Sequence, residues 1–466
     1  MLYLTSAGLI LLCTFSVAIA DTSCNFTTSS NSSLGTLSCI SVNESNTYST
    51  AANNALLNNS SDVNRTTSFV LEITDSNFSS LQSWIVSPLS TILDRVISVN
   101  LTNSSIETID NNILSQFVSL QTVDLSWNQI KSINASIFQG CGNLTTLSLA
   151  NNPIIAYENN SFGNLTNLKT LNLTVFVGNI SAESLNSTSL EKLNFVSSNI
   201  TWFNDNNFIF VPNLTELRFD NSTVNNNTNS TLNGLTKLVY LDKRLFRFTN
   251  DIPYGIFKDL KSVTDMDLSL IYIRGIYNGT FEGLTNVQSL NISLNFLLNI
   301  NDVNIFTPLQ NITSLDMAGS FILYPLPVNL FNPLKNLKQL NISNNPTDDL
   351  VTPGVLNGLD NLELLDMSDN LWFGINATAL SNLKKLRWLY LDNNFLSLTV
   401  FPQFDYKTLA DELVSLEYIG ISDNRWQCDE LYDMLTYFKS KNISYTPKFV
   451  STADPNVDGI DCTENN

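Results

Sequence analysis

Six aspartates are the side chains in this sequence best suited to acid–base chemistry. Five of them stand at the fifth position of an apolar pattern that repeats along the chain. These five are Asp124, Asp242, Asp267, Asp316 and Asp366, and the sixth, Asp265, stands just before Asp267. Pairs of carboxylates hydrolyse glycosides, and groups of carboxylates bind calcium. A third interpretation, which we favour, is that the row does no chemistry and makes one surface of the protein acidic.

The composition excludes most other catalytic chemistry. None of the 466 residues is a histidine, so Ser-His-Asp, Cys-His and HExxH sites are absent. The chain has 42 acidic residues against 23 basic ones, and its net charge of -19 argues against binding to nucleic acid or to anionic membranes. We therefore expect a binding protein that is not an enzyme and uses no cofactor or metal.

The first twenty residues have the features of a secretory signal peptide. The apolar run at residues 9–17 is followed by Ala18-Ile19-Ala20, a small-x-small cleavage site. No Lys or Arg precedes the run, so a retained anchor is the alternative. No other stretch approaches eighteen uninterrupted apolar residues, and we expect no membrane span. The sequence predicts a secreted, extracellular protein that begins near Asp21.

Asn-x-Ser/Thr triplets agree with an extracellular location. There are 27 of them, none with Pro in the middle, which predicts a heavily glycosylated surface. Chance triplets in an Asn-rich chain are the alternative. Four triplets begin at the same fifth position of the repeat as the aspartates: Asn100, Asn172, Asn291 and Asn341. No triplet lies between Asn376 and Asn442, so we expect that stretch to be free of glycans.

A repeat of about 24 residues organises the chain. The pattern apolar-x-x-apolar-x-apolar-x-x-Asn-x-apolar begins at residues 96, 120, 144, 168, 190, 214, 238, 263, 287, 312, 337, 362, 386 and 416, with a weaker copy at 68. Alternation of apolar and polar residues predicts a short strand with one buried face, and successive strands stack in parallel at about 4.8 Å. We expect the Asn at position nine to hydrogen-bond neighbouring backbone, and a Phe or Leu six residues before each start to form a second stack. Each turn buries its apolar edges only against its neighbours, which predicts one solenoid.

The repeat resembles that of extracellular leucine-rich repeat proteins over about residues 68–426. Among them it is similar to secreted leucine-rich immune proteins of invertebrates, of the type without a coiled coil, and to Toll-like receptor ectodomains. The resemblance implies an α/β repeat solenoid, a horseshoe with a parallel concave β-sheet, an irregular convex side and disulfide-bonded caps. It also implies recognition of a protein partner or a pathogen surface in innate immunity. A structural or adhesive matrix component and a shed or decoy receptor ectodomain are the alternatives.

Caps at both ends of the solenoid divide the chain into four parts. Residues 1–20 form the signal peptide, 21–67 the N-terminal cap with an Asn/Ser/Thr-rich loop, 68–426 the repeats, and 427–466 the C-terminal cap with an amphipathic helix. The C-terminal cap departs from the family's usual motif, since Arg425 and Glu430 stand where that motif has Pro and Cys.

The cysteines fit these caps. In an oxidising compartment we pair Cys24 with Cys39 and Cys428 with Cys462. Cys141 stands where sister repeats have Leu, so we expect a buried thiol, with an intermolecular disulfide as the alternative. Both a homo-oligomer and a hetero-oligomer are compatible with these features.

The concave surface near the C-terminus is the leading candidate for partner binding. Trp388 and Tyr418 stand at position three of their repeats and Tyr390 at position five, so adjacent strands bring them into one patch with Asp366 and Asp392. Exposed Trp and Tyr surrounded by polar groups are typical hot spots of protein interfaces. The alternatives are that these rings cover the insertion at 401–407, or that they have no role.

A basic patch on the repeat that begins at residue 238 is the second candidate. Lys243 falls there at an inward position, where an unpaired ammonium costs several kcal/mol, so we expect the strand to shift and bring bases to the surface. Arg218, Lys243, Arg244 and Arg247 would then contact an anionic partner. An eroded repeat with solvated charges is the alternative.

Overall fold

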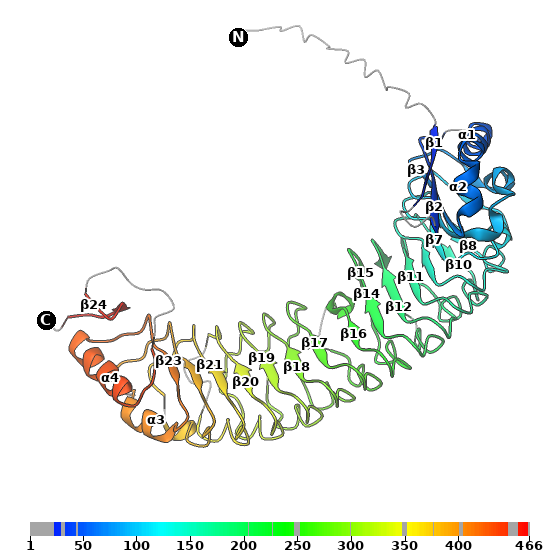
Figure 1. Ribbon diagram of the computed structural model, residues 1–466. Coiled ribbons are helices and arrows are strands. Elements are labelled where there is room, and N and C mark those ends of the chain that lie inside the picture. Colours follow the sequence, from blue (N-terminus) through cyan, green and yellow to red (C-terminus); the bar gives the residue numbers. More distant parts are fainter. Residues whose placement is uncertain are drawn as a thin grey trace, which may run out of the picture.

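The chain folds into a solenoid of stacked turns that curves as one arc, with a cap at each end (Figure 1). The computed structural model describes residues 23–28, 33–42, 45–203, 205–225, 227–246, 252–298, 300–346, 352–375, 377–399, 404–445 and 455–464. The expected signal peptide, residues 1–20, lies outside the described residues.

Short strands, one from each turn, form two sheets that follow one another along the arc. The ten-stranded sheet contains β1 (Ser23–Thr28), β2 (Leu34–Ile40), β3 (Ser68–Thr74), β5 (Val96–Asn100), β7 (Thr122–Asp124), β9 (Thr146–Ser148), β11 (Thr170–Leu173), β12 (Lys192–Phe195), β14 (Glu216–Arg218) and β16 (Tyr240–Leu241). The seven-stranded sheet contains β17 (Asp265–Asp267), β18 (Ser289–Asn291), β19 (Ser314–Asp316), β20 (Gln339–Asn341), β21 (Leu364–Asp366), β22 (Trp388–Tyr390) and β23 (Tyr418–Gly420). All neighbours are parallel except β1 and β2, which confirms the predicted parallel sheet.

The strands bury one face and leave the other partly open. In β7 the side chain at position four, Val123, is buried, while Thr122 and Asp124 at positions three and five are only half-buried. The same alternation holds in β21 and β22. We call the surface made by positions three and five the concave face.

The remainder of each turn is largely irregular, as expected for the convex side. Two-stranded pairs join β4 (Ser80–Leu81) to β6 (Thr108–Ile109), β8 (Ser132–Ile133) to β10 (Ala156–Tyr157), β13 (Asn199–Ile200) to β15 (Thr223–Val224), and β24 (Asn456–Val457) to β25 (Ile460–Asp461). The α-helices of the described residues are α1 (Ser45–Asn58), α2 (Ser60–Arg65), α3 (Tyr406–Glu412) and α4 (Cys428–Ser440). No helix among them is long and apolar enough to cross a membrane.

Buried asparagines at position nine hold consecutive turns together. Asn128 donates from Nδ2 to the carbonyls of Leu101 and Leu125, both at 2.9 Å, and its Oδ1 accepts the amides of Ser104 and Ile106 at 2.9 and 3.0 Å. One side chain thus satisfies four backbone groups in an interior that water does not reach. The predicted asparagine ladder is confirmed.

Phenylalanines form the second stack of the interior. The rings of Phe281 and Phe306 are 6.0 Å apart, and those of Phe306 and Phe331 are 5.8 Å apart, nearly parallel in both cases. All three side chains are fully buried. Stacked rings of this size add apolar burial to each turn, and the predicted stack is confirmed.

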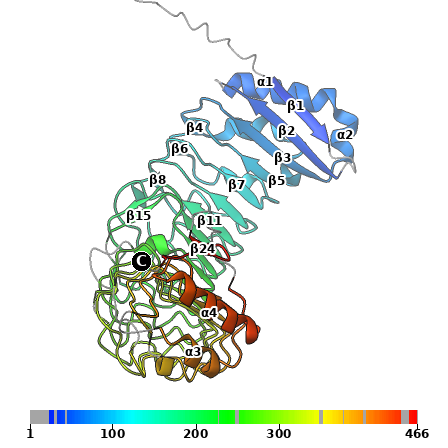
Figure 2. The same ribbon diagram turned by 90° about the vertical axis from the view of Figure 1, so that its left-hand side faces the viewer.

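Both caps are closed by the predicted disulfides. Cys24 and Cys39 face each other across the β1–β2 pair and are bonded, and Cys428 at the start of α4 is bonded to Cys462. Helix α4 buries Leu431, Met434, Leu435 and Phe438, so it is the expected amphipathic helix. Figure 2 shows α1 and α2 at the N-terminal end of the solenoid and α3 and α4 at the other end.

The Asn/Ser/Thr-rich loop expected within the N-terminal cap is instead helical over α1 and α2. Helix α1 buries Tyr48, Ala52, Ala55 and Leu56, which have helical spacing, and the Tyr48 hydroxyl donates to the carbonyl of Ile85. The buried side of this helix combines Tyr48 and Leu56 with two small residues, Ala52 and Ala55, whereas its other residues are mainly Asn, Ser and Thr. The Asn, Ser and Thr content of α1 therefore made the helical spacing of its buried residues hard to recognise in the sequence.

Candidate protein-binding surface

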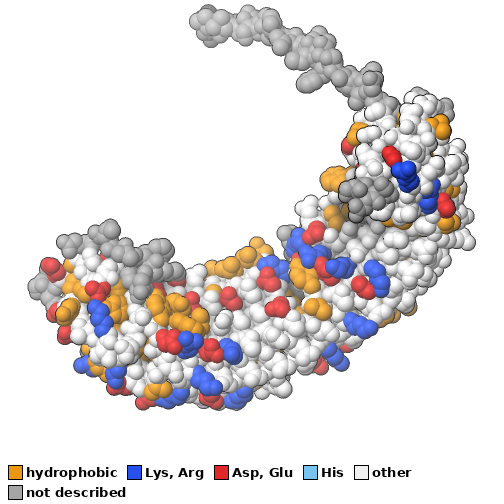
Figure 3. Space-filling view, viewed as in Figure 1, with side chains coloured by type: hydrophobic (Ala, Val, Ile, Leu, Met, Phe, Trp, Pro, Cys, Tyr) orange, Lys and Arg blue, Asp and Glu red, His pale blue; other side chains and the backbone are white. Residues whose placement is uncertain are grey.

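Strand register brings the predicted aromatic residues together. Trp388 lies between Leu364 and Tyr418 on the neighbouring strands, and Tyr390 lies between Asp366 and Gly420. The rings of Tyr390 and Tyr418 are 5.2 Å apart at an angle of 46°. We call Leu364, Trp388, Tyr390 and Tyr418 the aromatic patch; all four are half-buried. Figure 3 shows hydrophobic side chains gathered over this end of the seven-stranded sheet.

Asp392 lies beneath the aromatic patch and not on its rim, where we had expected it. Only 4% of Asp392 is exposed, and its Oδ1 accepts the amide of Ser422 at 2.9 Å. A Cβ atom at Gly420 would lie 2.0 Å from Oδ2 of Asp392. The carboxylate therefore fills the place of a side chain at 420 and supports the patch from below.

Asp366 belongs to a row of carboxylates and amides with a structural role. Its Oδ1 accepts the amide of Ser368 at 3.0 Å and the hydroxyl of the same serine at 2.6 Å. The same contact, from position five to the amide two residues later, is made by Asp124, Asp267, Asp316, Asn100, Asn291 and Asn341. The row thus caps the backbone at the end of these strands, a role that the sequence analysis missed.

Charge is unevenly distributed around the aromatic patch. On one side Arg387 and Glu417 form a bidentate ion pair at 2.8 Å, and the Arg387 guanidinium lies 4.3 Å from the centre of the Trp388 ring. Asp366 lies next to Tyr390 on the neighbouring strand, and Asp316 lies two strands further along the sheet. Burial is the main cause that raises the pKa of Asp316, and the charges of Asp366 and Asp267 raise it further. No group of three acidic or cysteine side chains in the described ranges is placed to hold a metal.

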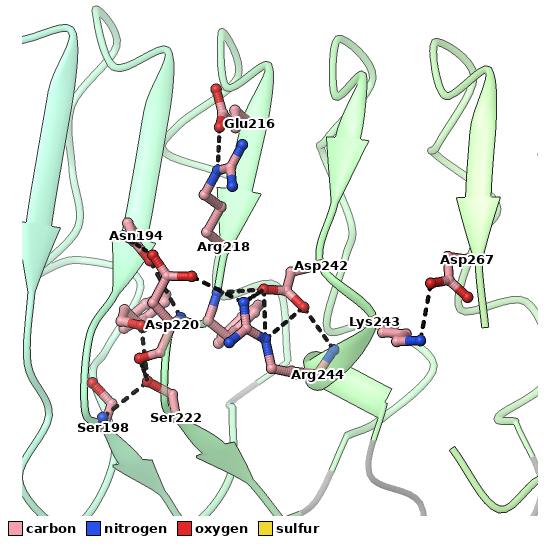
Figure 4. A network of polar contacts seen from close by, with 12 residues as sticks. Asn194, Ser198, Glu216, Arg218, Asp220, Ser222, Asp242, Lys243, Arg244 and Asp267 are labelled. Carbon is pink, nitrogen blue, oxygen red and sulfur yellow. Dashed lines mark hydrogen bonds and ion pairs between the residues drawn. The ribbon is translucent and has the colours of Figure 1, made fainter. Parts of the chain in front are cut away.

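The second candidate, the basic patch, is a network of ion pairs (Figure 4). Arg244 pairs with Asp242 at 2.6 Å and with Asp220 at 2.9 Å, and Lys243 pairs with Asp267 at 2.9 Å. Arg218 and Lys192 both pair with Glu216. Four bases thus face four acids, so the network carries no net charge. Arg247, the remaining predicted member, lies outside the described residues.

This network lies where the two sheets part. The expected strand shift is present: β16 stops at Leu241, residues Lys243–Phe246 form a 3-10 turn, and Leu245 is fully buried. Among the described strands, β16 and β17 are not paired. Lys243 spans the gap to reach Asp267 and the hydroxyl of Ser269. A pocket of about 480 Å³ opens here, with Tyr240 and Met266 in its lining.

The four asparagines expected to carry concave glycans all stand at position five, and all are half-buried: Asn100, Asn172, Asn291 and Asn341. Asn291 and Asn341 use Oδ1 to cap an amide. Asn341 is the neighbour of Asp366 on the next strand. A glycan on Asn341 would therefore stand at the edge of the aromatic patch and bound it on that side.

An exposed row of aromatic rings escaped the sequence analysis. Tyr272, Phe296 and Phe321 stack along one edge of the solenoid, with centres 6.0 and 5.2 Å apart, although 62%, 37% and 49% of these residues is exposed. All three stand at position ten of consecutive repeats, so the regular spacing was the available signal. Leu270 and Leu294 beside them have left-handed backbone, with φ of 59° and 56°.

Two stretches of the sequence, residues 119–174 and 335–396, match the family model described as leucine rich repeat. No curated protein matches the sequence. Together with the stacked parallel strands and the disulfide-bonded caps, the match defines the class of fold: a leucine-rich repeat horseshoe with a cap at each end.

Solved structures show which members of this class it resembles. A structure of the Drosophila Toll–Spatzle complex contains a chain with 16% identity and a TM-score of 0.67, and the match covers 90% of this chain and 62% of that one. A TLR13–ssRNA13 complex gives 17% identity, a TM-score of 0.63, and coverage of 88% and 60%. A Leptospira interrogans LRR protein has 21% identity and a TM-score of 0.51, and the match covers 82% of this chain and 84% of that one. The fold therefore resembles Toll and Toll-like receptor ectodomains, and the chain spans about three fifths of those two receptor chains.

Proposed function

We propose that this protein is a secreted, glycosylated recognition protein that binds another protein, or a microbial surface, through the aromatic patch. The observation that carries the proposal is the set of large rings, Trp388, Tyr390 and Tyr418, held half-exposed on adjacent strands. Rigid aromatic side chains in a partly desolvated patch supply most of the binding energy in protein interfaces. Strand β22 is paired on both sides and holds Trp388 and Tyr390 in place, so little entropy is lost on binding.

Three further observations support this proposal. The aspartate row makes structural contacts with backbone amides, as Asp366 does with Ser368. Phosphate binding needs unpaired Lys and Arg, whereas the bases on the concave face are paired with acids. A solved relative of the fold, Toll, is seen in complex with Spatzle. We extend that mode of action, recognition of a macromolecule in innate immunity, to this chain.

Affinity capture from the extracellular fluid of the source organism tests the proposal. The bait is the glycosylated full chain, and the variant is Trp388→Ala combined with Tyr390→Ala. Trp127→Ala is the matched control, because 61% of Trp127 is exposed and it lies far from the aromatic patch in the sequence. A saturable partner that is lost only with the double variant supports the proposal. A partner retained by the double variant, with folding intact by circular dichroism, contradicts it.

A further inference from the structure

Gly420 leaves a gap in the row of position-five side chains, and a carboxylate fills it. Gly420 lies beside Tyr390 of the neighbouring strand and two residues after Tyr418 on its own strand. The carboxylate of Asp392 takes the place of the missing side chain. Two rings 5.2 Å apart therefore lie beside a buried carboxylate.

The negative charge acts on both rings. Burial raises the pKa of Tyr390, and the carboxylates of Asp366 and Asp392 raise it further. Burial, followed by the charge of Asp392 and by Tyr390, raises the pKa of Tyr418 to about 12. The faces of aromatic rings attract cations, so rings beside two carboxylates form a favourable place for a positive charge.

Arginine completes the same combination elsewhere on the concave face. The guanidinium of Arg218 lies 4.6 Å from the centre of the Tyr240 ring and pairs with Glu216. Arg387 is related in the same way to Trp388 and Glu417. In the part of the chain that the structure describes, no Lys or Arg pairs with Asp366 or lies over Tyr390. Among the described residues, the ring of Tyr390 and the carboxylate of Asp366 therefore lie on adjacent strands without such a base.

We propose that a lysine or arginine side chain of the protein partner completes the arrangement, with its charged group over Tyr390 and paired with Asp366. Asp392 acts as a positioning residue, since it holds a second negative charge beneath the rings. This inference rests on the proposed function and adds the chemistry of the partner. The partner must present a basic side chain at the centre of its contact surface, next to apolar groups that cover Trp388 and Leu364.

A peptide pair tests the inference without knowledge of the natural partner. The probe is a short fluorescent peptide with two arginines, and the control probe has citrulline, the uncharged isostere of arginine, in both places. Anisotropy titrations in about 0.15 M salt, which screens charges farther apart than roughly 8 Å, compare the full chain with Asp366→Asn and Asp124→Asn. Asp124 is the matched control, because it makes the same contact with an amide but lies in the other sheet.

We expect Asp366→Asn to weaken binding of the arginine peptide about fivefold or more, as for a charge pair at an interface, and Asp124→Asn to weaken it less than about twofold. Tyr390→Phe keeps the ring and should retain binding, whereas Tyr390→Ala should lose it. Equal effects of the two Asn variants, equal binding of the arginine and citrulline peptides, or full binding by Tyr390→Ala would each overturn the inference.

The outcome is separable from that of the proposed function. If a natural partner is lost with Trp388→Ala while peptide binding ignores Asp366, recognition through the aromatic patch stands and the cationic contact is rejected. If peptide binding depends on Asp366 while capture of the natural partner ignores the aromatic patch, the proposed function is rejected and the cation site stands.

Discussion

Asp392 and Gly420 share one position on the concave face, because a Cβ atom at Gly420 would lie 2.0 Å from Oδ2 of Asp392. In most rungs of the seven-stranded sheet, the position-five side chain caps the amide two residues later, as Asp366 does for Ser368. Gly420 has no side chain to do this, and Asp392 reaches across from the previous turn to accept the amide of Ser422. The backbone of the last repeat is therefore capped by a side chain of the previous repeat, Asp392. The same carboxylate lies beneath the aromatic patch.

Gly420→Ala should disrupt this arrangement. The added methyl group displaces the Asp392 carboxylate, which leaves a buried amide without its acceptor, and we expect a loss of about 1–3 kcal/mol in unfolding free energy. Urea denaturation of the variant and of the unmodified chain measures this loss. Gly142→Ala is the control, since the nearest atom to its Cβ is 3.5 Å away. Equal stability of the two variants would show that the shared position has no energetic consequence.

Asn345→Ala should be among the most destabilising changes in the protein. The amide of Asn345 accepts the backbone N–H groups of Ser320 and Ile322 and donates to the carbonyls of Met317 and Ile342. Its removal leaves these buried groups unsatisfied, at about 1–3 kcal/mol for each group that finds no new partner. The exposed Asn336 makes a contact with Gln310, and Asn336→Ala should lower the thermal midpoint much less. A similar drop in both variants would contradict the role of the ladder.

Periodicity explains which features could be predicted from the sequence. The asparagine ladder, the phenylalanine stack and the parallel strands repeat at a fixed interval, so each copy supports the others. The arrangement of Asp392 and Gly420 occurs only once among the described repeats and depends on a contact between two turns. No repeated sequence pattern therefore predicts it. The buried face of α1 was hard to recognise because two of its four members, Ala52 and Ala55, are small residues. The aromatic patch was predictable because strand register alone brings Trp388 next to Tyr418.

Leu270→Asn should stabilise the protein. Leu270 has a φ of 59° and is 59% exposed, so the side chain gains little from burial while its backbone is in the left-handed region. Asn tolerates that region better than Leu does, and we expect a gain of about 0.5–1 kcal/mol. Leu298→Asn replaces another exposed leucine, one that lacks a positive φ, and it should be close to neutral. Calorimetry that finds Leu270→Asn less stable than the unmodified chain would show that the leucine makes compensating contacts.

Arg244→Met should destabilise the protein in a way that depends on pH. Burial favours a raised pKa for Asp242, but its hydrogen bonds with Arg244 and the amide of Phe219 outweigh this, and the pKa is lowered. Asp242 therefore contributes stability above its unfolded pKa of about 3.9, and this contribution is lost as the pH falls through the lower folded value. Without Arg244, burial dominates and the sign reverses.

We expect Arg244→Met to lose about 3 kcal/mol at pH 7, because a buried carboxylate is left unpaired, and to lose much less near pH 4, where that carboxylate is protonated. Urea denaturation at pH 7 and at pH 4 measures the loss of unfolding free energy at each pH. Lys169→Met breaks an exposed pair with Glu191 and should cost less than about 1 kcal/mol. A loss for Arg244→Met that does not change with pH would mean that Asp242 is neutralised by another group.

The location of partner binding is the central claim, and hydroxyl-radical footprinting tests it most directly. The full chain is oxidised alone and in complex with its captured partner, and mass spectrometry measures the oxidation of each aromatic residue. We predict that the partner protects Trp388, Tyr390 and Tyr418 several-fold and leaves the exposed Trp127 unchanged. Protection of Trp127 or of Tyr272, with no change at Trp388 and Tyr390, would contradict the account.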